Sequence, residues 1–474
     1  MSVELFKHQR DYLTQRWDSP YWGLWWEMGS CKTLSILVNA ELLRRAEKIG
    51  GLLIIAENGV HLNWRRDQSE YLPSSRFVGY SSYDTKWQRE AIKDLFTYTA
   101  GLRILSINVE AFSFPNSRAT KLAMDFLKTT KCMIAVDEAT CIKNPKAART
   151  KVVLALRNLA PYRRALSGTI SGDKPFDVWS PLEFLQKGAT GLNYFQFQKE
   201  HGIFEVKQFG PRSFNAVTGY KHLPEVKKLL EKYGNFVAKS DCLDLPPKLY
   251  ETHECEMNDK QTVLYALVKK NISVEFNGSH IEPINAMAKL QYLHNIAIGF
   301  VKHDDGRIEW ISESRLVDLC CLLELSGMKK TIIWSCSIPA INKIVLTLAS
   351  KYGRNSYVEY HGAIPTETRF ANVTRFQNDP ECLFFVANQE AAGKSLTLHA
   401  AWYEIYFRNG YSLEDRLQSE DRAHRAGLTH SVTIIDMVVP KTADENVVTA
   451  LRSKQDIASQ IVPFLKRVTT TDKQ

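Results

Sequence analysis

The sequence predicts an α/β protein of two tandem, doubly wound parallel-sheet lobes with helical insertions. Short apolar runs alternate with helix-length segments over roughly the first 170 residues, and the same alternation resumes near Lys330. Runs of this kind are typical of strands that are covered on both faces of a parallel sheet. The chain has 474 residues, which is too long for one hydrophobic core, so two or three domains are expected.

In the first lobe, we expect an N-terminal helix followed by a strand–helix alternation. Leu5, Leu13 and Trp17 would share one stripe of the helix, with Gln9 among its polar residues. The expected strands are the apolar runs at 51–57, 102–108, 132–140 and 163–170. In the second lobe, the expected strands are 329–335, 383–388, 403–409 and 431–439. An amphipathic helix carrying Val447, Leu451, Ala458 and Ile461 is expected at the C-terminal end.

Between Phe176 and about Ser240 the pattern changes to aromatic and lysine-rich helical stretches. The segment Asp244–Lys248 (DLPPK) is expected to be a rigid connector, because paired prolines disfavour both helix and central strand. Another mainly helical region continues to about Ile298. We therefore expect an N-terminal lobe at 1–240 with a helical protrusion from about 176, and a C-terminal lobe at 241–474 with a helical protrusion near 250–300.

The composition is that of an ordinary soluble globular protein, with 44% hydrophobic and 24% charged residues. No apolar run approaches the roughly 18 residues that span a bilayer, and the charged N-terminus does not resemble a secretory signal. The nine cysteines are scattered, so free thiols in a reducing compartment are expected. A net charge of +9 and a pI near 8.9 mildly favour a polyanionic partner.

A candidate phosphate-binding loop occupies the turn Gly29-Ser30-Cys31-Lys32-Thr33. The turn lies between an apolar run and a segment with helical periodicity, so its backbone N–H groups and the helix N-terminus could meet a phosphate. Lysine would neutralise phosphate charge, and the threonine hydroxyl would ligate magnesium. The G-x-x-x-x-G-K-[ST] motif would place glycine at Trp26 and Cys31, and neither position has it. Taken alone, the turn leaves a nucleotide site and an ordinary turn equally open.

Two further segments could take part in the same chemistry. Asp137 and Glu138 follow an apolar strand, where one carboxylate can hold magnesium and the next can deprotonate an attacking water. Adjacent acids can also simply begin a loop or cap a helix. Gln418, Arg422 and Arg425 are spaced to share one helical face, where two arginines could stabilise a transferring phosphoryl group. The alternative is a surface salt bridge between Asp421 and Arg425.

Two small-residue turns are candidates for coupling to nucleic acid. Ser167, Gly168 and Thr169 end a strand of the first lobe, where they could sense phosphate or form a solvent-side turn. Gly393 and Ser395 lie in AAGKSLTL after a strand of the second lobe. We expect this second turn to contact nucleic-acid phosphate through its backbone N–H groups.

These segments, in this order, resemble the Swi/Snf-like DNA translocases of helicase superfamily two, and the likeness covers nearly the whole chain. The resemblance rests on seven segments: EMGSCKT, IIAENGVHLNWRRDQ, AVDEATCIKNPKA, LSGTISGDKPFDVWSPLEFL, DLPPK, HGAIPTETRFANVTRFQ and QSEDRAHRAG. It implies two RecA-like lobes that bind ATP and Mg²⁺. Cys31, Ile170 and Leu428 depart from the family pattern, which uses glycine, proline and glutamine there.

The resemblance also implies a role for each candidate residue. Gln9 would bind adenine, and Gly29, Ser30, Cys31, Lys32, Thr33, Asp137 and Gln418 would bind the nucleotide. Thr33 and Asp137 would hold the metal. Lys32, Glu138, Arg422 and Arg425 would be catalytic. Ser167, Gly168, Thr169, Gly393 and Ser395 would couple hydrolysis to nucleic acid.

The expected function is that of an ATP-dependent motor that translocates on double-stranded DNA, with the nucleotide bound between the lobes. A strand-separating helicase acting on RNA or single strands, and a catalytically weak nucleic-acid clamp, are the alternatives. We expect a monomer that acts without a membrane in the cytoplasm, or in the host cytoplasm or nucleus if the source is viral or eukaryotic. The compact chain suits a bacterial or viral protein, and its sequence does not indicate a protein partner.

Overall fold

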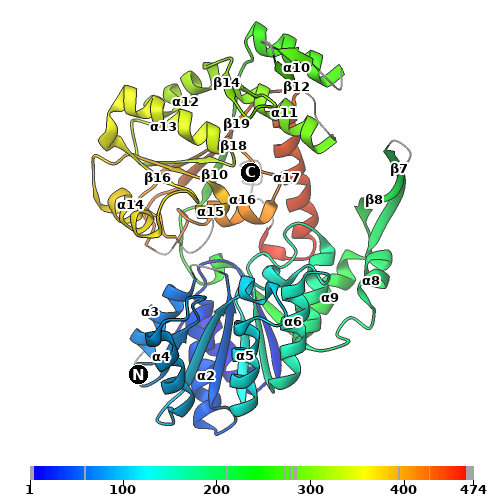
Figure 1. Cartoon of the computed structure of the whole chain (residues 1–474), viewed down its shortest axis with the longest axis vertical. Coiled ribbons are helices and arrows are strands. Elements are labelled where there is room, and N and C mark those ends of the chain that lie inside the picture. Colours follow the sequence, from blue (N-terminus) through cyan, green and yellow to red (C-terminus); the bar gives the residue numbers. More distant parts are fainter. Residues whose placement is uncertain are drawn as a thin grey trace. The chain divides into compact units, whose positions relative to one another are not determined.

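The computed structural model describes residues 5–57, 60–209, 212–270, 274–276, 279–281, 286–392, 396–425 and 427–465. The chain divides into two compact units (Figure 1). The first extends to Asp244 and includes a C-terminal segment that begins at Gln455, and the second runs from Leu245 to Lys454. In the described ranges, no helix combines the length and the apolar character that crossing a membrane requires.

The first unit is built on one seven-stranded parallel sheet with the strand order β3-β4-β2-β5-β6-β1-β9. Its strands are β1 (Tyr21–Trp26), β2 (Gly51–Ala56), β3 (Arg76–Gly79), β4 (Arg103–Asn108), β5 (Cys132–Val136), β6 (Tyr162–Leu166) and β9 (Gly234–Val237). The four predicted strands are confirmed as β2, β4, β5 and β6. The short edge strands β3 and β9 were not predicted, because each has only four residues and a mixed burial pattern.

Helices cover both faces of this sheet, so central strands such as β2 and β5 are buried on both sides (Figure 1). Along β2, Leu52, Ile54 and Ala56 pack into one core cluster, while Leu53 and Ile55 point to the opposite face and are equally buried. The helices before the insertion are α1 (Lys7–Gln15), α2 (Lys32–Arg45), α3 (His61–Tyr71), α4 (Lys86–Thr97), α5 (Arg118–Thr129), α6 (Ala148–Leu156) and α7 (Trp179–Leu185).

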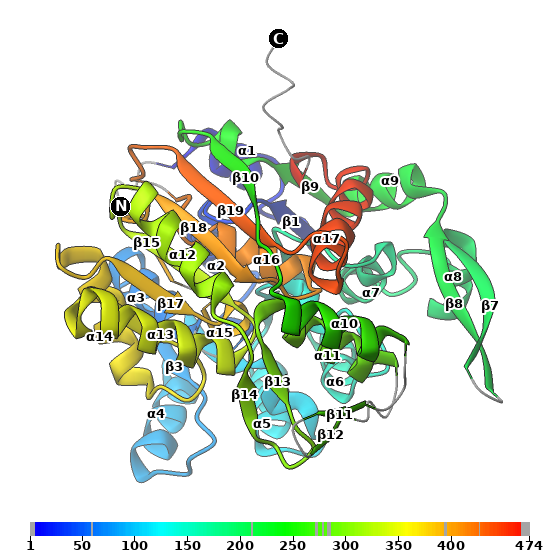
Figure 2. The same ribbon diagram turned by 90° about the horizontal axis from the view of Figure 1, so that it is seen from above.

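The predicted helical insertion contains helices and also a β-hairpin. Helices α8 (Tyr194–His201) and α9 (Leu223–Tyr233) flank the antiparallel strands β7 (Gly202–Phe209) and β8 (Arg212–Tyr220). The expectation of purely helical structure from Phe176 onward is therefore wrong for this hairpin. Figure 2 shows the hairpin extending outward beyond α8. Most described side chains of β7 and β8 are exposed, so no buried face imposes the alternating apolar pattern that identifies a strand.

The second unit has a six-stranded parallel sheet with the order β10-β19-β18-β15-β17-β16. Its strands are β10 (Lys248–Glu254), β15 (Thr331–Ser335), β16 (Tyr357–Tyr360), β17 (Phe384–Ala387), β18 (Tyr403–Arg408) and β19 (Val432–Val438). The four predicted strands are confirmed as β15, β17, β18 and β19. The region after the DLPPK segment was expected to be helical, but Lys248 instead begins the edge strand β10.

The remaining elements of the second unit include the helices expected before Ile298 and at the C-terminal end. The C-terminal helix ends at Ser459, so Ile461, which was expected on it, lies beyond the helix. The helices are α10 (Asp259–Lys270), α11 (Ala286–Ile298), α12 (Ser314–Leu325), α13 (Ile338–Tyr352), α14 (Thr366–Asn378), α15 (Gln389–Ala392), α16 (Leu413–Glu420) and α17 (Ala443–Ser459). Two small hairpins, β11 (Val274–Phe276) with β12 (Ser279–Ile281) and β13 (Phe300–Lys302) with β14 (Ile308–Trp310), were not predicted. Both are short and lie outside the parallel sheet.

A buried charge network ties three helices of the second unit together. The Asp444 carboxylate accepts hydrogen bonds from Arg315 Nη1 at 2.7 Å and from His294 Nε2 at 2.9 Å, and all three side chains are buried. Burial by itself would raise the pKa of Asp444, but the Arg315 guanidinium and the His294 ring lower it below its ordinary value. The ionised carboxylate therefore contributes stability above its unfolded pKa of roughly 4, and this contribution is lost as the pH falls toward the folded pKa.

We predict that Asp444→Asn lowers the free energy of unfolding of the second unit by about 3–5 kcal/mol at neutral pH, because it leaves the buried Arg315 charge uncompensated. Glu324→Gln is the matched control, since Glu324 lies on the same helix as Arg315 and pairs with Lys351 in a largely exposed position. It should cost far less. Denaturant unfolding checks both variants, and equal losses in the two would contradict the role of the buried network.

Candidate nucleotide site

Three strands of the first sheet end side by side at the candidate site. β6 lies between β5 and β1, and all three run parallel, so their carboxyl ends meet at one edge. The phosphate-loop candidate follows β1, the Ser167–Thr169 turn follows β6, and Asp137 with Glu138 follows β5. Ligands of open α/β sheets bind at this edge. The structure thus brings the loop at 29–33 together with two motifs that follow it by more than one hundred residues in the chain.

The loop after β1 has the backbone shape of a tight turn into a helix. Gly29 has φ +82°, and Cys31, the residue before α2, has φ 59° and ψ 41°. Both are in the left-handed region, which glycine adopts without strain and cysteine does not. Cys31 therefore occupies a conformation that glycine would favour. This agrees with the family pattern, which has glycine at this position. Lys32 Nζ donates to the carbonyl oxygens of Trp26 at 2.8 Å and Glu27 at 3.2 Å.

Gln9 supports the loop from α1. Its side-chain Nε2 donates to the Cys31 carbonyl at 3.1 Å and to Ser35 Oγ at 3.1 Å, and the side chain is fully buried. His8 Nε2 lies 2.9 Å from the Ser30 carbonyl, a contact that was not predicted. The structure thus places Gln9 against the loop itself, and its contact with adenine stays a prediction. Adjacent His and Gln residues in the first helix are the signal that could have indicated both contacts.

Asp137 is held at the end of β5 by two donors. Trp64 Nε1 donates to its Oδ2 at 2.7 Å, and the Glu138 backbone N–H donates to its Oδ1 at 3.1 Å. The surrounding protein raises the pKa of Asp137, although the side chain keeps some solvent exposure, and the Trp64 hydrogen bond and the Lys32 ammonium oppose that shift. Trp64 had no predicted role, although it lies in one of the segments that resemble the family.

Glu138 is bonded directly to the turn that follows β6. Its Oε1 accepts from the Ser167 hydroxyl and from Thr140 Oγ1 at 3.3 Å, and Ser167 Oγ also accepts from the Thr169 backbone N–H at 3.1 Å. Glu138 has φ 51°, a second strained backbone position at this edge. The turn therefore joins the second carboxylate to the end of β6.

Gly168 brings the same turn against the phosphate loop. A Cβ at this position would lie 3.1 Å from the backbone nitrogen of Met28 and 3.2 Å from the carbonyl oxygen of Trp26. A larger residue would push the turn away from the loop backbone, so the close approach requires glycine. The Ser167–Thr169 turn consequently contacts both the loop after β1 and the carboxylate after β5.

The oxygen donors at this edge fit a hard divalent cation. Thr33 offers a hydroxyl in the first turn of α2, and Asp137 offers a carboxylate beside the Lys32 charge. Mg²⁺ prefers oxygen ligands of this kind, with one or two supplied by the protein and the rest by water and phosphate. The residues present therefore fit magnesium.

The arginine motif of the second unit has a different backbone from the one predicted. Helix α16 ends at Glu420, so Arg422 and Arg425 follow the helix and do not share a helical face with Gln418. The prediction failed because the i, i+4 and i+7 spacing continues beyond the point where the chain turns. Arg422 Nε donates to the Gln418 carbonyl at 2.8 Å, and its Nη1 donates to the Leu396 carbonyl at 3.2 Å.

Arg425 is less buried than Arg422 and bonds to the same neighbouring segment. Its Nε donates to the Asp421 backbone carbonyl at 2.9 Å, and its Nη1 donates to Thr397 Oγ1 at 3.3 Å. The Asp421 carboxylate pairs with Lys248 at 2.9 Å. Gly393 and Ser395 lie outside the described residues, so their predicted contacts with nucleic acid stay predictions.

A residue that was not predicted anchors this motif. Arg416 on α16 is buried, donates from Nε to Glu420 at 2.7 Å, and pairs with Asp436 on β19. Its guanidinium also lies 3.5 Å from the centroid of the Tyr406 ring. These contacts hold α16, and with it the turn that carries the arginines, to the sheet of the second unit. The signal in the sequence is weak, because Arg416 precedes the recognisable motif.

Comparison with known proteins identifies two family domains in the chain. Residues 24–296 match the SNF2-related domain, and residues 314–427 match the helicase conserved C-terminal domain. The DNA annealing helicase and endonuclease ZRANB3 of Mus musculus is 23% identical over 460 residues, covering 94% of this chain and 40% of that protein. The SWI/SNF-related matrix-associated actin-dependent regulator of chromatin subfamily A containing DEAD/H box 1A of Danio rerio is 23% identical over 470 residues, covering 87% and 46%.

Among solved structures, the SWI2/SNF2 ATPase core of Sulfolobus solfataricus in complex with dsDNA has a TM-score of 0.43 and 21% identity, covering 97% of this chain and 93% of that one. The chain spans less than half the length of the two curated relatives. The SNF2-related match alone extends over more than half of the 474 residues. On that basis the chain belongs to the SNF2-related family of helicase-type ATPases.

Proposed function

We propose that this chain is an ATP-driven motor that translocates on double-stranded DNA. The observation that carries the proposal is the contact of one turn, Ser167–Thr169, with both the phosphate-loop backbone and the Glu138 carboxylate. A motor must link the state of its nucleotide to the state of its track, and a turn that touches both the loop and the general base can transmit such a change. The net charge of +9 and the name of the relative ZRANB3, a DNA annealing helicase, favour DNA as the track.

In this function, the loop after β1 binds the nucleotide phosphates. Its backbone N–H groups and the N-terminus of α2 point at the phosphates, and Lys32 exchanges its present carbonyl partners for phosphate oxygens. Thr33 and Asp137 hold Mg²⁺, which when bound neutralises charge on the transferring phosphoryl group. Trp64 fixes the orientation of Asp137 through the hydrogen bond to Oδ2.

Glu138 acts as the general base toward the attacking water. Its Oε1 accepts hydrogen bonds from Ser167 and Thr140 in the present arrangement, and release of the Ser167 hydrogen bond would open one acceptor position for the water proton. Ser167 is therefore a positioning residue, because its hydrogen bond determines whether the Glu138 carboxylate can accept a proton from water. Movement of the Ser167–Thr169 turn with the nucleic-acid track would then control hydrolysis.

Arg422 and Arg425 are the proposed catalytic arginines, and Gln418 is proposed to support the nucleotide. Planar guanidinium groups can bind phosphate oxygens with two parallel hydrogen bonds and stabilise the charge of the transition state. Arg425 is the better candidate to contact phosphate, since Arg422 is buried and bonds to two backbone carbonyls. Action as a monomer in the cytoplasm or nucleus remains a prediction.

A catalytically weak clamp is the second candidate, and Cys31 favours it. Its left-handed conformation strains the phosphate loop, and its Cβ and thiol add bulk beside the phosphate position. A clamp would bind nucleic acid without turnover. The motor and the clamp therefore differ in whether ATP hydrolysis occurs at all. A strand-separating helicase would differ from the proposed motor in being stimulated by RNA or single strands.

We predict that duplex DNA stimulates ATP hydrolysis by the wild-type chain more strongly than RNA or single strands do. Glu138→Gln should lower the rate by about 10²–10⁴-fold, because it removes the general base and keeps the shape of the side chain. Glu110→Gln, which removes a partly exposed carboxylate paired with Arg149, is the matched control and should leave the rate unchanged. Steady-state phosphate release with each polymer measures these rates. If the wild type released phosphate no faster than Glu138→Gln with every polymer, the clamp would be favoured.

We expect Arg425→Ala to lower DNA-stimulated hydrolysis by about 10³–10⁵-fold, the range typical of an arginine that stabilises the phosphoryl transition state. Arg452→Ala provides the control, since Arg452 lies in the same unit and bonds to Thr252 Oγ1 at an exposed position. Single-turnover hydrolysis together with nucleotide-binding measurements separates lost chemistry from lost affinity. Equal activity in the two variants would remove Arg425 from the site.

Mg-ATP is expected to protect Cys31 from alkylation, because phosphate bound in the loop covers the exposed thiol. Cys321, an exposed thiol on α12, should react at the same rate with and without nucleotide. Maleimide labelling followed by peptide mass spectrometry measures both positions. Unchanged labelling of Cys31 would show that the loop does not hold phosphate.

A further inference from the structure

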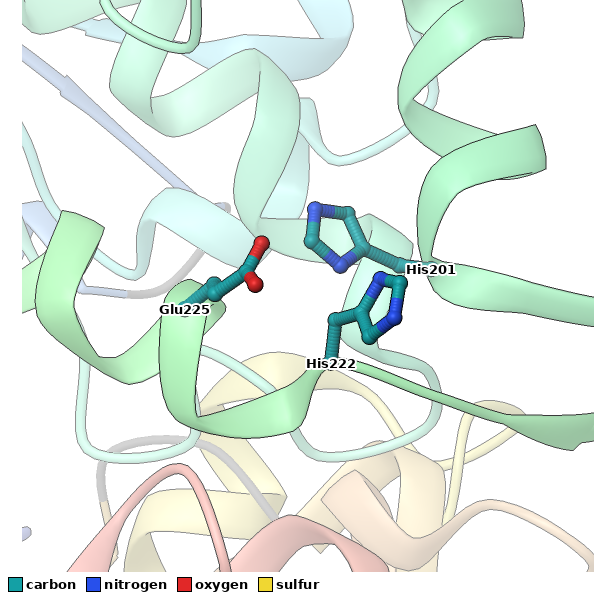
Figure 3. Close-up of side chains that lie close together, drawn as sticks. All are labelled: His201, His222 and Glu225. Carbon is teal, nitrogen blue, oxygen red and sulfur yellow. The ribbon is translucent and has the colours of Figure 1, made fainter.

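Two histidines and a glutamate meet at the base of the β7–β8 hairpin, away from the nucleotide motifs in the sequence (Figure 3). His201 is the last residue of α8, His222 precedes α9, and Glu225 lies in the first turn of α9. One possible ligand atom from each side chain lies within 4.8 Å of those of the other two. The hairpin leaves the body of the first unit at His201 and returns at His222, so the three residues bracket its two ends.

The His201 ring lacks a partner for one of its nitrogens. Nδ1 is buried and has no hydrogen bond within the described part of the chain. A buried polar atom without a partner is costly and calls for a missing water or ion. The ring packs against Phe197, with centroids 4.5 Å apart.

The second histidine is oriented by a carboxylate from outside the triad. His222 Nδ1 lies 3.0 Å from Glu200 Oε1, which favours the tautomer with a proton on Nδ1 and leaves Nε2 as the atom with a free lone pair. A carboxylate bonded to the far side of an imidazole is the usual support for a metal-ligating histidine. His222 also has φ 55°, so its backbone adopts an uncommon conformation at this position.

We propose that His201, His222 and Glu225 form a binding site for a divalent transition-metal ion of the zinc class. Two imidazoles and one carboxylate suit Zn²⁺, whereas Mg²⁺ prefers oxygen donors alone. Tetrahedral ligands at a zinc–nitrogen distance of about 2.0–2.1 Å are about 3.3 Å apart. The possible ligand atoms lie within 4.8 Å of one another, so zinc binding requires them to approach by at most about 1.5 Å. Three protein ligands leave the fourth position to water.

The metal explains how the hairpin is held to the body of its unit. A two-stranded hairpin is at best marginally stable alone, and among the described strands β7 and β8 pair only with each other. An ion bound at His201 and His222 links the residue before β7 to the residues after β8. This link closes the segment at its base and lowers the conformational entropy of the open state.

A second cluster, His253, Cys255 and Asp318, has a similar spacing and weaker chemistry. Burial raises the pKa of the Cys255 thiol to about 12, so the thiolate that a metal requires is strongly disfavoured. This cluster serves as the internal comparison for the test.

Zinc binding by the full chain, stripped with EDTA and dialysed, tests the proposal. The variants are Glu225→Gln and, as the matched control, Glu231→Gln, which removes a half-exposed carboxylate from the same helix. His222→Asn is a second ligand variant, chosen because asparagine tolerates left-handed backbone. Competition with a chromophoric zinc indicator gives affinity and stoichiometry, and Co²⁺ absorption reports the ligand set.

Wild type and Glu231→Gln should each bind one more equivalent of zinc than Glu225→Gln and His222→Asn. Affinity in these two variants should fall by at least about 100-fold, beyond the ten- to hundredfold typical of losing an outer-shell partner. Glu200→Gln should show that smaller loss.

Zinc should also slow proteolysis between 202 and 220 in wild type and Glu231→Gln only. Equal zinc binding in wild type and Glu225→Gln, or loss of the site only in Cys255→Ser, would overturn the proposal. Matching thermal unfolding of metal-free Glu225→Gln and Glu231→Gln controls for misfolding.

Discussion

The adjacency of β5, β6 and β1 in one parallel sheet is the constraint on which the candidate site depends. Parallel strands end at the same edge, so this order places two carboxylates, a small-residue turn and a phosphate-loop candidate next to one another. The contacts at the edge are close: a Cβ at Gly168 would lie 3.1 Å from the Met28 nitrogen of the loop backbone, and Ser167 donates a hydrogen bond to Glu138. A shift of β6 along either neighbour would break both contacts.

This edge also contains strained backbone at two non-glycine positions. Cys31 and Glu138 both have left-handed conformations, which cost of order 1–3 kcal/mol each. Hydrogen bonds hold both residues in place. Gln9 donates to the Cys31 carbonyl, and Ser167 donates to the Glu138 carboxylate. In the second unit, buried charges have the corresponding role: Arg416 holds α16 to Asp436, and Arg315 with Asp444 joins helices to the end of the sheet. Polar contacts of this kind specify positions that apolar packing alone leaves free.

The elements that could be predicted are those buried on both faces. β2, β5 and β17 are continuous apolar runs because helices cover the sheet on each side, and such runs are visible in the sequence. Edge strands such as β10, with its largely exposed side chains, lack that signal. Most described side chains of the β7–β8 hairpin are exposed, so burial imposes no continuous apolar run on this segment. The error at Arg422 has a different cause. The residue spacing suggested a helix there, but α16 ends two residues earlier, at Glu420.

The sequence by itself determined the two-lobe α/β architecture, the family and the candidate residues Lys32, Asp137 and Glu138, because these follow from local order and spacing. Only the tertiary structure decided which groups touch. Trp64 bonds to Asp137 across 73 residues, and Gln9 bonds to the loop from another helix. His201 and His222 are 21 positions apart without a recognisable metal motif, and the hairpin between them brings them together. Contacts of this kind depend on strand order and chain reversal, which no short segment of sequence encodes.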